Sequence, residues 1–176
     1  TFYARAGVFY FGPRNNELAE VLELAWGKGL LTFSPEANLA RQITSVEVYG
    51  WSVENGAPVV GRASRGEESG RDTGRESGAE RIAKALGEQP VMRLRAEVHT
   101  QAEADELART ILEERAQEFV TGDGECVGLP EIVPDVNVAL TGLGRAFGKT
   151  YYVSEANHKV DSNGYRTTFK VEETTV

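Results

Sequence analysis

Alternating apolar and polar residues give the clearest structural signal along the chain. From Met92 to Val98 every second residue is apolar and the intervening ones are charged, which is typical of a strand with one buried face. Thr100 then stands three residues before Glu103, the spacing of a capping box, and apolar residues recur at helical spacing as far as Leu112. The pattern predicts a strand followed by one long helix at about residues 100–117.

Short apolar runs punctuated by glycine predict strands in most of the remaining chain. We expect a hairpin around Gly7, two runs separated by Gly27 and Gly29, and a single helical turn opened by Ser34 and Pro35. Further strands are expected over residues 44–52, 57–63, 118–128, 135–142, 150–160 and 165–171. The fold class is therefore mainly β with one long helix (α+β), and we expect a β-barrel with the 100–117 helix packed against it.

A segment rich in Gly, Ser and charged residues interrupts this pattern at residues 63–78. Its glycines at 66, 70, 74 and 78 would share one face of a helix, each costing about 1 kcal/mol relative to alanine. We therefore predict a flexible loop, followed by a short helix from Ala79 to Leu86 that ends at Gly87. A segment that becomes ordered against a partner is the functional alternative for this loop.

Charge and composition restrict the classes of function. The 176 residues carry a formal net charge of -8 without a distinct Lys/Arg cluster, so nucleic acid is not an expected partner. No apolar run approaches the roughly 20 residues that span a bilayer, so stable membrane insertion is not expected. Cys126 is the single cysteine, which excludes an intrachain disulfide and a cysteine-based metal cage and fits a cytoplasmic origin. The first residue is Thr1, and we expect the chain to be a piece of a longer polypeptide.

Ser154, His158 and Asp161 form the most suggestive catalytic grouping. On a strand Ser154 and His158 would share a face about 13 Å apart, whereas a triad requires contacts of about 3 Å. The same residues fit a hairpin in which the stretch from Asp161 to Gly164 reverses the chain. We therefore expect two strands and a turn here, not an active site.

Other candidate chemistry is also incomplete in the sequence. His99 and His158 lie in no metal-binding motif, and Asp123 in "TGDGE" lacks the remaining ligands of a calcium loop. The stretches "GLGRAFG" and "GKT", between residues 142 and 150, lack the spacing of a phosphate-binding loop. We accordingly predict no enzymatic activity, no catalytic, cofactor-binding or metal-binding residues, and no cofactor.

The stretch "GLGRAFGKTYYVSEANHKVDSNGYRTTFKVEE", following the long helix and the next strand, resembles the C-terminal barrel of the late control protein D family, which includes VgrG-like hub proteins of contractile phage tails and injection systems. The opening "FYARAGVFYFGP" resembles the hairpin that precedes this barrel in VgrG-like proteins. One departure is Asp135, where the family usually has glycine. The matching positions are Ala102–Ala116, Gly128–Pro130, Gly142–Gly144, Phe147-Gly148, Tyr151–Val153, His158 and Gly164–Phe169.

The resemblance implies a structural role in a baseplate hub that joins the tail tube to a membrane-piercing spike. Residues 1–34 would be the end of a preceding hub segment, and residues 35–176 a tube-like β-barrel domain. The implied partners are two further copies in a trimer of the full-length protein, the tail-tube protein, and a spike protein or domain. The protein would be cytoplasmic during assembly and then part of a phage tail, secretion apparatus or extracellular injection particle.

Two other hypotheses remain open from the sequence. A stand-alone β-barrel module could bind a carbohydrate or peptide through Trp26, Tyr49 and Trp51, provided that these side chains are exposed. A hydrolase could use His158 or Asp123, provided that a serine, an acid or a metal converges on one of them.

Overall fold

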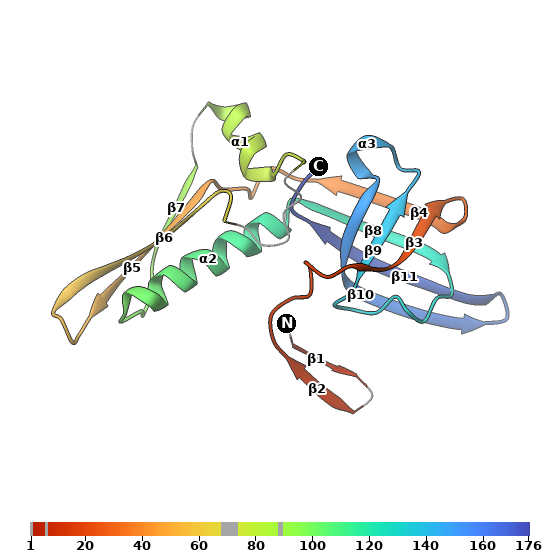
Figure 1. Ribbon diagram of the computed structural model, residues 1–176, viewed down its shortest axis with the longest axis horizontal. Helices are drawn as coiled ribbons and strands as arrows, with labels where there is room; N and C mark the ends of the chain where they lie inside the picture. Colours follow the sequence, from red (N-terminus) through yellow and green to blue (C-terminus); the bar gives the residue numbers. More distant parts are fainter. Residues whose placement is uncertain (1, 6, 68–73, 88–89) are drawn as a thin grey trace. The chain divides into compact units, whose positions relative to one another are not determined.

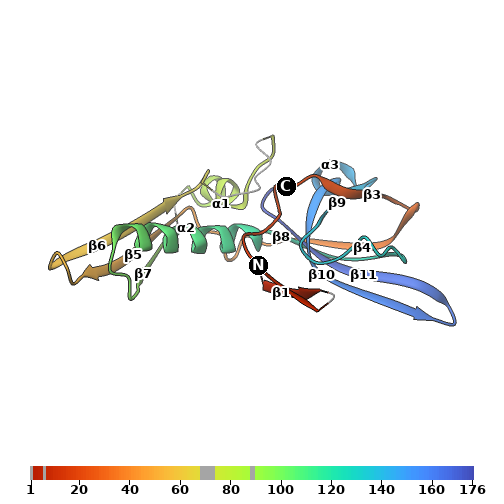
Figure 2. The same cartoon turned by 60° about the horizontal axis from the view of Figure 1, so that its bottom comes forward.

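The computed structural model describes residues 2–5, 7–67, 74–87 and 90–176, and these form two compact units. We call residues 1–36 and 121–172 the barrel unit, and residues 37–120 and 173–176 the sheet-helix unit. Figure 1 labels the strands and helices of each, and Figure 2 shows the same ribbon turned by 60°. Within the described ranges, no helix is both long and apolar enough to span a bilayer.

In the described part of the chain, six strands close a barrel in the order β10-β11-β8-β4-β3-β9 (Figure 1). Strand β10 runs antiparallel to both β11 and β9, whereas β3 runs parallel to β9, with Ala25 opposite Thr141. The short helix α3 (Gly144–Phe147) connects β9 to β10. The strand bounds are β3 (Glu20–Trp26), β4 (Gly29–Ala37), β8 (Val120–Val127), β9 (Asn137–Thr141), β10 (Lys149–Asp161) and β11 (Gly164–Glu173).

Aromatic rings fill the barrel where β8 lacks side chains. A Cβ atom at Gly122 would lie 2.8 Å from the Phe33 ring, and one at Gly124 would lie 2.4 Å from the Phe169 ring. Tyr151 is fully buried and packs edge-on against Phe33. Each such buried ring stabilises the barrel by roughly 1.5–3 kcal/mol relative to an exposed one, so the two glycines of β8 are required for packing.

A bulge at Ser154 changes which residues of β10 point into the barrel. Val153 pairs with Val171, but the next pair is Glu155 with Lys170, so Ser154 is the extra residue. Before the bulge, Tyr151 and Val153 point inward. After it, Ala156 and His158 lie on the inner face, because they are paired with the buried residues Phe169 and Thr167. The prediction that Ser154 shares a continuous face with His158 is therefore wrong, because one inserted residue shifts the two-residue period of a strand.

The sheet-helix unit contains the long helix predicted from the sequence. Its sheet has the order β6-β5-β7, from β5 (Ser45–Ser52), β6 (Ala57–Ser64) and β7 (Val91–Arg95). Helix α2 (Gln101–Gln117) covers one face of β5 and β6, and the predicted capping box of Thr100 and Glu103 is present. A Cβ atom at Gly61 would lie 2.1 Å from the Ala104 backbone, so α2 and β6 pack so closely here that only glycine fits at position 61. The buried core consists of Val46, Val48, Val59, Ala63, Val98, Ala104, Ala108 and Leu112.

The second helix, α1 (Gly78–Leu86), also begins and ends as predicted. Ser77 caps its first turn, and Gly87 ends it in the left-handed conformation, with φ 64°. Thr175 and Val176 pair with the residues that precede α1: Thr175 forms a β-bridge with Ser77, and the Val176 amide donates to the Glu76 carbonyl. Of the flexible loop predicted at 63–78, residues 68–73 lie outside the described residues, and β6 continues to Ser64.

The opening hairpin is formed by β1 (Phe2–Arg5) and β2 (Val8–Phe11) around Gly7, which has φ 79°. The rings of Tyr3 and Tyr10 stack across it with centroids 4.9 Å apart. All four residues of β2 are exposed, and Phe11 is 90% exposed. The hairpin prediction is confirmed, and its β2 strand leaves aromatic surface uncovered.

The mainly β class, the barrel and the long helix are confirmed, but the observed units differ from the division expected at residue 34/35. Strand β3 pairs with β9, and β4 continues to Ala37, so most of residues 20–37 belongs to the barrel unit. Helix α2 packs on β5 and β6 in the other unit. The helical turn expected at Ser34 and Pro35 is wrong, because both lie in β4. Hydrogen-bond pairing between distant strands decides these assignments, and local patterns do not encode it.

Candidate functional site

His158 joins the closing hairpin to the loop at residues 128–132. Its Nε2 lies 2.9 Å from the Ile132 carbonyl oxygen, which can only accept, so we assign the proton to Nε2. The Nδ1 atom then accepts from the Tyr165 hydroxyl at 2.9 Å, and Thr167 Oγ1 lies 3.0 Å away. Both ring nitrogens therefore hold neighbouring segments in place.

Gly128 completes this cluster. Its amide donates to the Tyr165 carbonyl at 2.9 Å, and a Cβ atom there would lie 1.9 Å from the Tyr165 ring. The Leu129 amide donates to Thr167 Oγ1 at 3.2 Å. The loop after β8 is thus bonded to the hairpin at three points, and no residue other than glycine fits at position 128 without movement.

Ser154 and Asp161 do not join His158. The Ser154 hydroxyl donates to the Lys170 carbonyl at 3.4 Å. Asp161 pairs with Lys159 at 2.9 Å and accepts from the Asn163 amide at 2.7 Å, as expected of a hairpin turn. Lys159, followed by that amide, lowers the pKa of the Asp161 carboxyl. The three residues lie in one hairpin with separate structural roles.

Asp123 lies on the outer face of the barrel, at an open hollow of about 460 Å³. The ion pairs nearby are Lys170 with Glu155 at 2.8 Å and Arg166 with Glu125 at 3.6 Å. Glu155, and more weakly Asp123, raises the pKa of Lys170. Polar residues from four strands line the hollow: Thr32, Ser34, Asp123, Glu125, Glu155, Asn157, Thr168 and Lys170. His158 is not among them, and its hydrogen-bond partners are Ile132, Tyr165 and Thr167, none of which is the serine or acid that the hydrolase hypothesis requires.

The remaining sequence candidates have local roles. His99 is exposed; its amide donates to the Glu103 carboxylate at 2.8 Å, and this amide together with that of Thr100 lowers the pKa of Glu103. The "GLGRAFGKT" stretch forms a turn at Gly142 and Gly144, both at φ 78°, followed by α3 and the start of β10. Within the described ranges, no group of three or more His, Cys, Asp and Glu side chains is placed to hold a metal ion.

Cys126 is buried in the barrel wall and faces away from solvent. Burial, with a smaller contribution from the charge of Glu125, raises the pKa of its thiol to about 11, although a hydrogen bond with Thr167 acts in the opposite direction. A thiol in this environment is protonated at neutral pH and is a poor nucleophile.

Asp135 is an anchor that sequence reasoning missed. It is the one non-glycine among the described residues with a positive φ, 70°, and it is only 7% exposed. Its carboxylate accepts from the Asn15 amide and side chain at 3.1 and 2.7 Å, and from the Tyr152 hydroxyl at 3.0 Å. The departure from the expected glycine was the available signal, since the position requires a left-handed backbone and the carboxylate binds the segment around Asn15.

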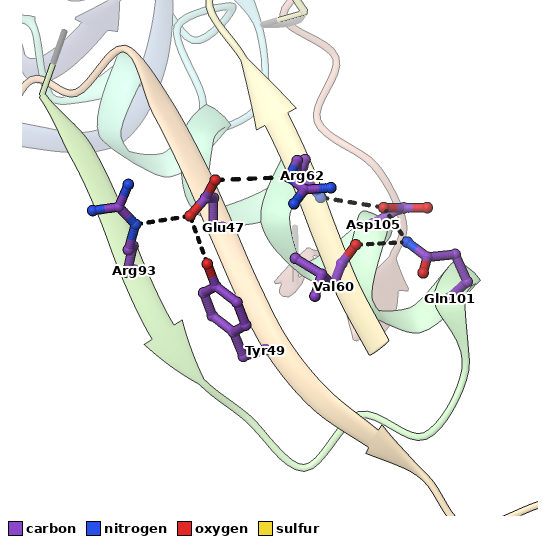
Figure 3. A network of polar contacts seen from close by, with 7 residues as sticks. All are labelled: Glu47, Tyr49, Val60, Arg62, Arg93, Gln101 and Asp105. Atoms are coloured by element: carbon purple, nitrogen blue, oxygen red, sulfur yellow. Dashed lines mark hydrogen bonds and ion pairs between the residues drawn. The ribbon is translucent and has the colours of Figure 1, made fainter. Parts of the chain in front are cut away.

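A second network lies on the face of the sheet opposite α2 (Figure 3). Glu47, on the central strand, accepts from Arg93 at 2.8 Å and from the Tyr49 hydroxyl at 2.8 Å, and lies 3.6 Å from Arg62. The Arg93 bond, then that of Tyr49, lowers the pKa of Glu47, while Glu47 raises the pKa of Arg93. Alternation along residues 45–52 and 91–95 indicated the faces, but the strand pairing that brings them together could not be read from it.

The three aromatic residues of the binding-module hypothesis belong to two units. Trp26 is 51% exposed in the barrel unit, and Trp51 is 54% exposed in the sheet-helix unit, so neither is core. Tyr49 lines an open hollow of about 300 Å³ together with Arg93, Leu94 and Arg95. Exposed aromatic surface is therefore present in each unit separately.

Comparison with solved structures shows that the fold is that of phage tail proteins. The tail protein from Neisseria meningitidis MC58 superimposes with a TM-score of 0.64 at 11% identity, over 95% of this chain and 48% of that protein. The 43 kDa tail protein of prophage MuSo2 from Shewanella oneidensis gives 0.57 at 9% identity, over 85% of this chain and 40% of that protein. The chain thus spans less than half the length of either.

The family of the chain follows from its sequence. The model of the Alg8 N-terminal domain family matches residues 6–162, and the chain belongs to this family. No curated protein matches the sequence.

Proposed function

We propose that the protein is a structural component of a phage tail or contractile injection baseplate, and that it acts in a hub joining the tail tube to a spike. The observation that carries the proposal is the likeness of its fold, over 95% of the chain, to the Neisseria meningitidis tail protein. The resemblance to the late control protein D family supplies the hub and the spike. On this proposal the full-length protein is a trimer, assembles in the cytoplasm and ends in a tail or injection particle.

The residues that carry the resemblance connect neighbouring segments by hydrogen bonds or form turns, as expected of a structural part that transmits force. His158 and Gly128 bond the 128–132 loop to the closing hairpin. Gly142 and Gly144 turn the chain between β9 and β10. A closed barrel also has no free strand edges of its own, which favours controlled assembly over edge-to-edge aggregation.

The β1–β2 hairpin is the surface that we expect between copies. A two-stranded hairpin is marginally stable by itself, and clustered exposed apolar residues usually mark an interaction site. Phe9 is 74% exposed and Phe11 is 90% exposed, next to Val8 and Tyr10. An assembly that covers these four consecutive side chains would remove one continuous apolar surface from water.

Mass measurement on the full-length protein tests the proposal. We expect light scattering after size exclusion to give a trimer, and we expect Phe9→Ser combined with Phe11→Ser to shift it toward monomer. Val160→Ser is the matched control, since Val160 is 77% exposed at the far end of the β10–β11 hairpin and should leave the mass unchanged. A full-length protein that stays monomeric, alone and with the tail-tube protein, would refute the hub assignment.

A carbohydrate- or peptide-binding module is the second candidate, because Trp26 and Trp51 are half exposed. It predicts saturable binding on a glycan array that Trp51→Ala or Trp26→Ala abolishes while the fold persists. An array without binding by the intact protein would remove the carbohydrate-binding form of this candidate and leave the assembly proposal unaffected.

A further inference from the structure

The two edges of the β6-β5-β7 sheet differ in whether other parts of the chain bind their backbone groups. At the β6 edge, side chains of α2 take up backbone groups: Gln101 donates to the Val60 carbonyl at 2.9 Å, and the Arg62 amide donates to Asp105 at 3.2 Å (Figure 3). Strand β7 forms the opposite edge. Among the described residues, β5 is its one strand neighbour, so one edge is covered and the other is open.

The alternation of hydrogen bonds along β7 identifies the residues whose backbone groups point to the open edge. The Ala96 amide bonds to the Tyr49 carbonyl, and the Pro90 carbonyl accepts from the Thr44 amide, so even-numbered residues of this segment face β5. In a parallel ladder the alternate residues then direct their N–H and C=O groups away from the neighbour. Val91, Arg93 and Arg95 therefore present their backbone groups at the open edge.

The side chains of these same residues lie on the open face of the sheet. The strands β5, β6 and β7 carry four charged residues, namely Glu47, Arg62, Arg93 and Arg95, and strand pairing places all four on that face. Glu47 is opposite both Arg62 and Arg93, whereas Arg95 is opposite the uncharged Tyr49. Three of these four residues are arginines in a chain of net charge -8, and Arg95 makes no ion pair with any residue that the structure describes.

We propose that the open edge of β7 binds an extended acidic segment of a partner protein, which adds to the sheet as a further strand and places carboxylates on Arg93 and Arg95. Glu47 shows the geometry from the inner side: a carboxylate on a paired strand, directly opposite Arg93, reaches its guanidinium at 2.8 Å. An acidic residue on an added strand would occupy the equivalent position beside Arg95. The hollow between Tyr49, Leu94 and the two arginines gives room for that side chain.

An acidic strand fits better than a polyphosphate such as a nucleic acid. The net charge of the chain opposes a long polyanion, whereas a short segment with two or three carboxylates meets only the local positive face. The open backbone groups of β7 also offer hydrogen bonds that a strand satisfies. Charged side chains at an edge discourage pairing with apolar strands, and here they would select an occupant of opposite charge.

Binding of a defined peptide to the whole chain tests the proposal. The probe is an acetylated, amidated octapeptide of alternating Thr and Glu, compared by calorimetry with the Thr-Lys octapeptide and with single-stranded oligothymidylate. We expect saturable, salt-sensitive binding of the Thr-Glu peptide alone. Arg95→Gln should weaken it roughly three- to tenfold, and Arg109→Gln, an exposed arginine on α2, should leave it unchanged.

The strand geometry has its own test. Val91→Pro removes an edge-facing amide and keeps every arginine, so it should weaken binding as well, with circular dichroism verifying the fold. Independently, amide exchange at Val91, Arg93 and Arg95 should slow on binding. Unchanged amide exchange in the complex would overturn strand addition, and absence of peptide binding, or equal binding of oligothymidylate, would overturn the proposal as a whole. Neither outcome bears on the trimer measurement above.

Discussion

Replacing Asp135 separates two contributions that one residue makes to the barrel. Its carboxylate holds the segment around Asn15 and the Tyr152 hydroxyl, and its backbone adopts a left-handed conformation with φ 70°. Asp135→Ala removes the carboxylate and keeps the conformational cost. Asp135→Gly removes the carboxylate and relieves that cost, and Asp135→Asn keeps one acceptor oxygen and a residue type that tolerates the conformation.

The magnitudes follow from these contacts. Hydrogen bonds to a charged group contribute about 1.5–3 kcal/mol each, but bonds that share one carboxylate are not additive, so we expect Asp135→Ala to lower the free energy of unfolding by about 3 kcal/mol. The left-handed conformation costs a non-glycine residue about 1–2 kcal/mol, and part of this is offset by the larger freedom of glycine when unfolded. Asp135→Gly should therefore be less destabilising than Asp135→Ala by up to about 1 kcal/mol, and Asp135→Asn the mildest of the three.

Tryptophan fluorescence can report on the barrel unit alone. The chain has two tryptophans, and Trp51→Phe leaves Trp26 as the single reporter in the barrel unit. Urea unfolding of the three variants in this background gives their order of stability. If Asp135→Ala unfolds within about 0.5 kcal/mol of the parent, the carboxylate network contributes little. If the alanine variant is more stable than the glycine variant, the conformational argument is wrong.

Three further outcomes test other features. Gly61→Ala should destabilise the sheet-helix unit by about 1–3 kcal/mol, seen as loss of helical dichroism at lower temperature, because its Cβ would lie 2.1 Å from the Ala104 backbone; Gly12→Ala, with open space around it, should change nothing. Cys126 should react slowly with a disulfide reagent at pH 8 and quickly in urea. Since the pKa of its thiol is raised to about 11, its contribution to the free energy of unfolding is present below about pH 9 and lost as the pH rises toward 11. Cys126→Ser should remove that alkaline loss of stability. Because the pKa of Glu47 is lowered, its contribution is present above its ordinary pKa of 4.5 and lost as the pH falls below it; a thermal midpoint that drops equally on acidification in Glu47→Gln would contradict this role.

Local interactions explain which elements were predictable. Helix α2 and its capping box depend on residues within one turn of each other, and Gly7, Gly56 and Gly164 mark hairpin turns, all at positive φ. The parallel pairing of β3 with β9 joins residues more than a hundred positions apart, and side-chain alternation does not name a strand's partner. This pairing decides where the barrel unit begins.

The candidate sites were predictable to a lesser degree. The hairpin interpretation of residues 154–165 follows from turn chemistry, and Asp161 and Asn163 make the expected contacts. The bulge at Ser154 could not be foreseen, because a single inserted residue has no required residue type. The Glu47 network depends on the register of three strands, and the pairing partner of a strand is not encoded in its own alternation of side chains.

The interruption of the barrel by residues 37–120 affects the order of events during synthesis. Strands β3 and β4 leave the ribosome early and must wait for β8 to β11 before the barrel can close, whereas the central sheet and α2 come from one continuous stretch and can form first. Thr175 and Val176, which follow β11 in the sequence, complete the entry to α1. Until β8 and β9 emerge, β4 and β3 lack these neighbours and can pair only with each other, so slow decoding of residues 37–120 would prolong their exposure to aggregation and to chaperone capture.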